Sequence, residues 1–154
     1  MIMKIINQSN NCPFCIVDAI EKQRIIYGDA LLKVFPTNIP IVPGHVLICP
    51  TRHVSKIDDL KDEELLAVRD FIVRLKTVLR KVFGAEGFNF AWNEGVAAGQ
   101  SVCHLHIHVV PRKGGDTGIY GYDPREFLYR PGERAKTPDQ ELRKITNLIK
   151  NYLD

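Results

Sequence analysis

The chain has 154 residues, a length typical of one domain, and its composition is that of an ordinary globular protein. Hydrophobic residues make up 45% of the sequence and charged residues 25%, which argues against an intrinsically disordered chain. The 21 Lys and Arg exceed the 18 Asp and Glu by a formal charge of +3, too small an excess to indicate nucleic-acid binding. We therefore expect a single domain over residues 1–154.

The N-terminal segment predicts neither a signal peptide nor a membrane anchor. Residues 1–11 have a short apolar start and one lysine, without the apolar run of a signal peptide. No segment approaches the roughly 20 apolar residues needed to span a bilayer. We expect a cytoplasmic protein with no membrane partner, in which the four cysteines stay reduced.

The CPFC sequence of residues 12–15 is the first candidate for chemistry. Two cysteines at this spacing occur in redox dithiols, in zinc sites and as buried thiols without a function. A redox dithiol is expected between a strand and a long helix, whereas here only a short helical pattern follows. A zinc site needs four nitrogen or sulfur ligands, and the distant His53 and His104 are available. These alternatives stay open at this point.

The next segments indicate two short strands, a rigid loop and a third strand. Residues 25–35 predict a hairpin around Gly28 and Asp29. Residues 36–44 contain three prolines and a glycine, which leave this loop few conformations to lose when a ligand binds. Residues 46–49 are the expected third strand.

Residues 58–83 change to a helical period and predict one long amphipathic helix. Its apolar stripe consists of Leu65, Val68, Ile72, Leu75, Leu79 and Val82. Asp58 or Asp59 is the expected N-cap and Gly84 the expected C-terminal cap. Phe71 and Val78 widen the stripe, which fits either a broad core or a partner helix across a dimer.

Two strands follow the helix, and the second carries three histidines. Residues 88–93, FNFAWN, alternate in polarity and are expected to pair with the histidine strand. His104, His106 and His108 stand at every second position, so a strand places them on one face at intervals of about 6.6 Å. We expect this strand to end at Pro111, which cannot donate to a ladder.

The sequence HLHIHVV of residues 104–110 resembles the signature of the histidine triad (HIT) family of nucleotidyl hydrolases and transferases. The resemblance extends through residues 92–102 and 40–54 and covers most of residues 12–116. RKGGD, residues 112–116, is similar to the diadenosine-polyphosphate hydrolase (Fhit-like) branch, whereas residues 93–102 are similar to the phosphoramidase (Hint-like) branch. Residues 117–137 are expected as an extended loop and residues 138–153 as a C-terminal helix.

The expected fold is α+β and HIT-like. About five antiparallel strands form a meandering sheet, the long helix packs on one face, and the C-terminal helix follows. The resemblance also implies a homodimer whose sheets join, and a small nucleotide as the substrate.

The resemblance implies a nucleotide hydrolase that acts at the α-phosphate of a nucleoside phosphoramidate or a dinucleoside polyphosphate. His106 is the expected nucleophile, because an imidazole that is largely neutral at pH 7 can attack phosphorus. Water then hydrolyses the nucleotidyl-histidine and releases a nucleoside monophosphate. His108 and His45 are the other expected catalytic residues.

The expected nucleotide and phosphate contacts are Asn38, Asn93, Gln100, Ser101 and His108. Family members carry an Asp or Asn for the ribose at the position of Thr37, so Asn38, one residue later, is the expected substitute. The resemblance also implies one structural zinc per chain, held by Cys12, Cys15, His53 and His104, since four protein ligands leave no position for substrate. A nucleotide-binding regulatory protein with slow, incidental hydrolysis is the alternative function.

Overall fold

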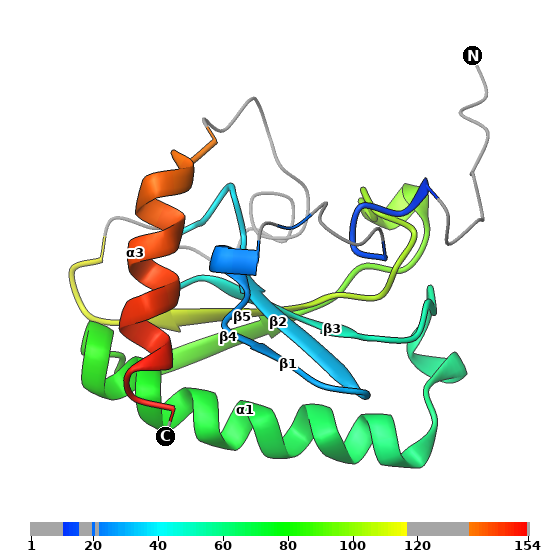
Figure 1. Cartoon of the computed structure of the whole chain (residues 1–154), viewed down its shortest axis with the longest axis horizontal. Coiled ribbons are helices and arrows are strands. Elements are labelled where there is room, and N and C mark those ends of the chain that lie inside the picture. The colour runs from blue at the N-terminus through cyan, green and yellow to red at the C-terminus, as the bar shows by residue number, and fades with distance from the viewer. Residues whose placement is uncertain (1–10, 16–19, 21, 117–135, 154) are drawn as a thin grey trace.

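The computed structural model describes residues 11–15, 20, 22–116 and 136–153 of the chain. Among these residues, five strands form one antiparallel sheet in the order β1-β2-β3-β5-β4 (Figure 1). The strands are β1 (Tyr27–Gly28), β2 (Leu32–Pro36), β3 (Val46–Pro50), β4 (Gly87–Ala91) and β5 (Ile107–Arg112). The helices are α1 (Asp62–Phe83) and α3 (Asp139–Lys150), with the 3-10 turns η2 (Lys22–Arg24), η3 (Ile57–Asp59) and η4 (Val96–Ala98). The α+β fold expected from the sequence is confirmed.

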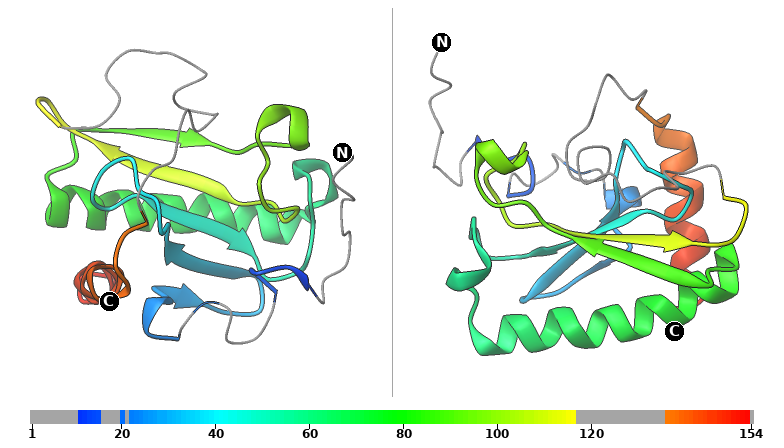
Figure 2. Two further views of the ribbon diagram at one scale, coloured as in Figure 1. Left: turned by 90° about the horizontal axis from the view of Figure 1, so that it is seen from above. Right: turned by 180° about the vertical axis from the view of Figure 1, so that it is seen from behind.

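The hydrophobic core lies between the sheet and α1, which runs along one face of the sheet (Figure 1). Val34, Ile48 and Val109 from the strands meet Leu75 and Leu79 from the helix, and all five are buried. Helix α3 packs against β2, η2 and α1 (Figure 2). No helix in the described ranges has the length and apolar character that crossing a membrane requires.

The start of α1 differs from the prediction. Asp58 and Asp59 lie in η3, and the helix begins at Asp62 with Lys61 at the N-cap position. The Glu64 carboxylate accepts the Lys61 N–H at 2.8 Å, so the side chain of the third helical residue closes the helix start. The predicted cap at the other end is confirmed, because Gly84 adopts φ 67°.

The apolar stripe of α1 is confirmed except at Leu65, which is 49% exposed. A helix of 22 residues is about 33 Å long, whereas a six-residue strand such as β5 spans about 20 Å. The first turn therefore extends beyond the sheet. Phe71 and Val78 are buried in the core of this chain, which supports the broad core over the partner helix.

The histidine strand begins later and ends later than predicted. β5 runs from Ile107 to Arg112 and includes Pro111, which lies opposite Phe88 of β4. β3 pairs with β5 only up to Val109, so Pro111 has a neighbouring strand on one side alone. Residues 104–106 precede the ladder and are held instead by a hydrogen bond of 2.6 Å from the Leu105 N–H to the Val54 carbonyl.

The first hairpin also turns at a different place. Gly28 belongs to β1, and the turn is made by residues 29–31. The Asp29 carboxylate accepts the N–H groups of Leu31 and Leu32 at 2.8 and 2.7 Å, which is a local side-chain turn. The extended loop expected over residues 117–137 lies outside the described residues except for its last two positions.

Candidate functional site

Four side chains from three distant parts of the chain converge near the start of β5. The ligand atoms of Cys12, Cys15, His53 and His104 all lie within 4.8 Å of one another. The Cys15 Sγ is 3.1 Å from His53 Nδ1 and 3.3 Å from His104 Nδ1, and Cys12 Sγ is 3.4 Å from the same His104 nitrogen. Ligands of a tetrahedral zinc with bonds of 2.0 to 2.3 Å stand about 3.3 to 3.8 Å apart, so this donor set fits zinc.

His104 has the correct tautomer for a metal ligand. Its Nε2 lies 2.8 Å from the Pro50 carbonyl oxygen, which can only accept, so Nε2 carries the proton and Nδ1 offers its lone pair to the cluster. The ring is fully buried, and this burial lowers the pKa of His104 to about 4. The imidazole is therefore neutral at pH 7, as a metal ligand must be.

The Cys15 thiol lacks the lowered pKa expected in a redox pair of the glutaredoxin type. Burial and the neighbouring Cys12 raise the pKa of the Cys15 thiol to about 11, whereas a redox dithiol needs a thiolate near neutral pH. All four cysteines of the chain lie among the described residues, and no disulfide joins them. A cation is the partner that would favour the thiolate form here.

His106 is held by its own backbone. Its Nδ1 lies 2.7 Å from the carbonyl oxygen of His104, so Nδ1 is the donor and the neutral ring carries its lone pair on Nε2. The ring of Phe14 contacts the His106 ring edge to face, with centroids 5.3 Å apart. The next imidazole, His108, stands 5.2 Å from His106 between ring centroids. The predicted side-by-side arrangement of these two histidines is confirmed.

His45 and His108 form a hydrogen-bonded pair whose protons can be assigned. The Ile41 N–H donates to His45 Nδ1 at 3.1 Å, so the proton of the neutral His45 ring is on Nε2. That nitrogen lies 2.9 Å from His108 Nδ1 and donates to it. His108 consequently carries its own proton on Nε2. The His45–His108 pair therefore places the Nε2–H donor of His108 next to the ring of His106.

Phe14 is a site residue that the sequence analysis missed. It lies inside the Cys12–Cys15 turn, which is closed by a hydrogen bond of 2.9 Å from the Cys15 N–H to the Cys12 carbonyl. The same turn that supplies two thiols therefore places an aromatic ring against His104 and His106. The signal available in the sequence was an aromatic residue between two metal-type cysteines.

The proposed ribose contact lies in the loop before His45. Thr37 is buried, and its hydroxyl accepts the Ile39 N–H at 3.4 Å. Asn38 is half-buried, and its main-chain carbonyl accepts the Thr137 N–H at 2.7 Å. The structure thus turns Thr37 inward and leaves the side chain of Asn38 more accessible to solvent.

The predicted phosphate contacts lie in the loop between β4 and the triad. Asn93 donates to the Gly99 carbonyl at 3.3 Å, and Gln100 bridges the Gly95 N–H and the Ser55 carbonyl at 2.7 and 3.1 Å. These contacts hold the loop that carries Ser101, which is exposed. The roles of Asn93, Gln100 and Ser101 toward a ligand remain predictions.

Comparison with known proteins identifies the family. The family model for the HIT domain matches residues 19–115. This chain belongs to the HIT family. Among the relatives of this HIT protein, a bis(5'-adenosyl)-triphosphatase of Dictyostelium discoideum is 37% identical over 136 residues, which are 86% of this chain and 91% of the relative.

Two further matches extend the comparison. An asymmetrical bis(5'-nucleosyl)-tetraphosphatase of Schizosaccharomyces pombe is 39% identical over 93 residues, which are 60% of this chain and 51% of the relative, so the HIT protein spans about half of that relative. Among solved structures, a zinc-bound histidine triad family protein from Mycobacterium smegmatis superposes with a TM-score of 0.72 at 30% identity, covering 95% of each chain. The names of the two relatives support a nucleotide hydrolase activity of the HIT type.

Proposed function

We propose that this HIT protein hydrolyses dinucleoside polyphosphates at the α-phosphate through a covalent nucleotidyl-histidine on His106. The observation that supports the proposal is the hydrogen bond from His106 Nδ1 to the His104 carbonyl, because it leaves the lone pair of the neutral ring on Nε2, where a nucleophile needs it. The names of the relatives favour this substrate class, and an adenosine phosphoramidate is the alternative substrate for the same pocket.

In the first step, the lone pair of His106 Nε2 attacks the α-phosphorus and the bond to the bridging oxygen breaks. The electron pair of that bond leaves with the oxygen of the remaining nucleotide. His108 Nε2–H is the donor that stabilises or protonates this oxygen, and His45 orients it. The proposed contacts from Asn93, Gln100 and Ser101 would hold the phosphate oxygens, and Asn38 the ribose.

In the second step, water attacks the phosphorus of the nucleotidyl-histidine and the phosphorus–nitrogen bond breaks. If His108 gave up its proton in the first step, it can accept one from this water. The products are a nucleoside monophosphate and His106 with its lone pair restored on Nε2. Splitting the displacement into two steps is the advantage of a nucleophilic side chain over direct attack by water.

We propose one structural zinc per chain at Cys12, Cys15, His53 and His104. When bound, the metal would crosslink the N-terminal turn to the start of β5 and to the segment after β3. The zinc would be structural, because four protein ligands leave no coordination position for a substrate. The link to catalysis is Phe14, which the same turn packs against His106.

We propose further that the chain is one domain that works as a homodimer in a reducing compartment such as the cytoplasm. β4 is an edge strand of the sheet, and Phe90 and Trp92 at this edge are 43% and 44% exposed. An uncovered edge with large apolar side chains favours pairing with a second copy.

The test is a substrate panel combined with trapping of the intermediate. Diadenosine triphosphate, diadenosine tetraphosphate and adenosine phosphoramidate are offered separately, and the products are resolved by chromatography. With substrate labelled at the α-phosphorus, wild-type protein quenched in alkali should retain label that is lost in acid, as expected of a phosphoramidate bond.

His106→Ala should lower turnover roughly 10⁴-fold or more and carry no label, whereas His108→Ala should lose only the factor of about 10² to 10⁴ typical of an acid–base group. Retained binding of adenosine monophosphate and an unchanged circular dichroism spectrum are the controls for folding. The proposal is wrong if wild-type protein turns over substrate without ever carrying label. Tight retention of an unhydrolysed substrate would favour the nucleotide-binding regulator.

A further inference from the structure

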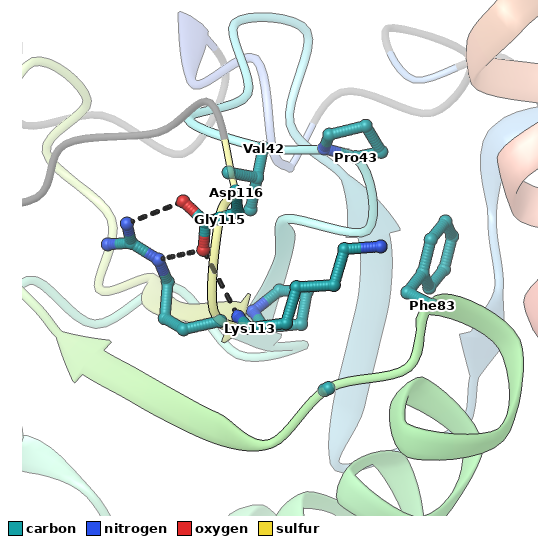
Figure 3. Close-up of a pocket in the computed structure, with 9 residues that line it drawn as sticks. Val42, Pro43, Phe83, Lys113, Gly115 and Asp116 are labelled. Atoms are coloured by element: carbon teal, nitrogen blue, oxygen red, sulfur yellow. Dashed lines mark hydrogen bonds and ion pairs between the residues drawn. The ribbon is translucent and has the colours of Figure 1, made fainter.

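A hollow of about 260 Å³ lies at the end of β5 that is farther from His106 (Figure 3). Its apolar wall is formed by Val42 and Pro43 from the loop before β3, Phe83 at the end of α1, Ala85 just after that helix, and Pro111 from β5. A cavity with these walls favours an apolar group, because removing apolar surface from water is favourable.

The hollow is separate from the imidazoles. Alternate residues of β5 point to opposite faces, so Pro111 follows Ile107 and Val109 toward α1, whereas His106 and His108 point to the other face. Along the strand, Pro111 is about 10 Å from His108. An occupant of the hollow therefore lies outside reach of the nucleophile and is not the reacting nucleotide.

Lys113, at the mouth of the hollow, carries a charge that no ion pair among the described residues neutralises. Arg112 makes two hydrogen bonds of 2.9 Å with the carboxylate of the buried Asp116, so these two charges cancel. The Lys113 ammonium makes no ion pair within the described part of the chain. Figure 3 shows the Lys113 side chain extending past the hollow toward Pro43 and Phe83.

We propose that this hollow is a second binding site, for a small molecule that joins an apolar ring to an anionic group. The ring would fill the wall formed by Phe83, Ala85 and Pro111, and the anion would face Lys113. An ammonium without an ion pair among the described residues, beside an apolar surface, favours such amphiphilic anions over neutral rings or simple anions.

An occupant of this site would contact the turn that holds His45. Val42 and Pro43 line the hollow, and the His45 N–H donates to the Val42 carbonyl at 3.2 Å. Between them, Gly44 has φ 89°, and a Cβ there would stand 2.9 Å from the ring of Phe83, so the turn is tightly packed against the wall. His45 in turn donates to His108. Binding in the hollow would therefore change the hydrogen bond between His45 and His108. Its effect on catalysis rests on the proposed function.

The binding test uses 8-anilinonaphthalene-1-sulfonate, a fluorescent apolar ring system with one anionic group, and the uncharged N-phenyl-1-naphthylamine as its matched neutral probe. The full-length wild-type protein should bind the sulfonate at one saturable site that adenosine monophosphate does not displace. Ala85→Phe should abolish the signal by filling the hollow. Lys113→Gln should weaken the sulfonate roughly two- to fivefold, the contribution of an exposed ion pair, and leave the neutral probe unchanged. Lys56→Gln, on the loop before α1, is the control lysine.

The proposed site is overturned if wild-type protein shows no saturable signal, if adenosine monophosphate displaces the probe, or if Lys113→Gln behaves as Lys56→Gln. The coupling is read separately, by nuclear magnetic resonance of histidine labelled with ¹⁵N. Saturating sulfonate should shift the ring signals of His45 and His108 in wild type but not in Ala85→Phe. Unshifted rings with bound probe would overturn the coupling. Because neither readout uses turnover, loss of the proposed hydrolysis would not be confused with loss of this site.

Discussion

Removing the His45 imidazole should damage proton delivery more than it damages the fold. In the structure, His45 accepts the Ile41 N–H and donates to His108 Nδ1 at 2.9 Å, which fixes the proton of His108 on Nε2. His45→Ala deletes both contacts. Hydrogen bonds of this kind contribute about 1 to 3 kcal/mol when a buried partner is left unpaired, which converts to a loss of roughly 5- to 150-fold in kcat.

The assay compares two leaving groups at the same phosphorus. Diadenosine triphosphate is one substrate, and adenosine 5'-(4-nitrophenyl phosphate), whose nitrophenolate leaves without a proton at pH 8, is the other. The kcat loss in His45→Ala should be large on the first substrate and small on the second. His45→Gln keeps a side-chain amide that can donate to His108, and it should recover part of the activity.

Equal losses on both substrates would refute this reasoning, because they would assign His45 to folding or binding. A loss in His45→Ala that exceeds the loss in His108→Ala would refute it as well, since a residue acting through His108 cannot contribute more than His108 itself.

Four other predictions concern metal binding, pH-dependent stability, ribose binding and the start of α1. His53→Ala should lower the zinc content from about one per chain, measured by native mass spectrometry, and should also reduce turnover because Phe14 loses its support against His106. In chelator-treated protein, the free energy of unfolding should fall as the pH drops from 6.5 toward 4, since the unfolded chain binds a proton on His104 in that window and the folded chain, with its pKa of about 4, does not; constant urea midpoints across this range would contradict it. Asn38→Ala should weaken binding of adenosine monophosphate in calorimetry and leave the melting temperature unchanged, with Thr37→Ala as the matched variant, and unchanged affinity would mean that the ribose is held elsewhere. Glu64→Ala should lower the melting temperature by about 2 to 8 °C, because it removes the closure of α1 and the Arg52 ion pair at 2.7 Å, whereas Asp70→Ala, in an exposed pair, should change it little.

The parts of the fold that the sequence predicted are those controlled by local periodicity. The period of α1 follows from apolar residues three and four positions apart, and the structure buries Val68, Leu75 and Leu79 as expected. The alternation of histidines with apolar residues placed His106 and His108 on one face for the same reason. The zinc ligands came from the family resemblance, because nothing local relates Cys12 to a histidine 92 residues away.

The features that the sequence did not predict depend on partners far along the chain. β5 starts at Ile107 because Leu105 is bonded to Val54 and His104 to Pro50, outside the ladder. The order of side chains in the sequence does not indicate that the main-chain carbonyls of Val54 and Pro50 accept these hydrogen bonds. The start of α1 was misplaced for a similar reason. Five acidic residues lie near that end, and the sequence alone does not show which of them pairs with Arg52. In the structure the partner is Glu64, which also accepts the N–H at the start of the helix.

The proton positions of the triad and its partner are all set by main-chain groups. A carbonyl at Pro50 fixes His104, a carbonyl at His104 fixes His106, and the amide of Ile41 fixes His45 and through it His108. No amino-acid replacement at Pro50 deletes its carbonyl, and only proline would remove the amide of Ile41. Neighbouring side chains can therefore change to suit new leaving groups while these main-chain groups keep the same tautomer at each imidazole. Loss of the proposed nucleophile, His106, would then require either its own mutation or a displacement of the backbone.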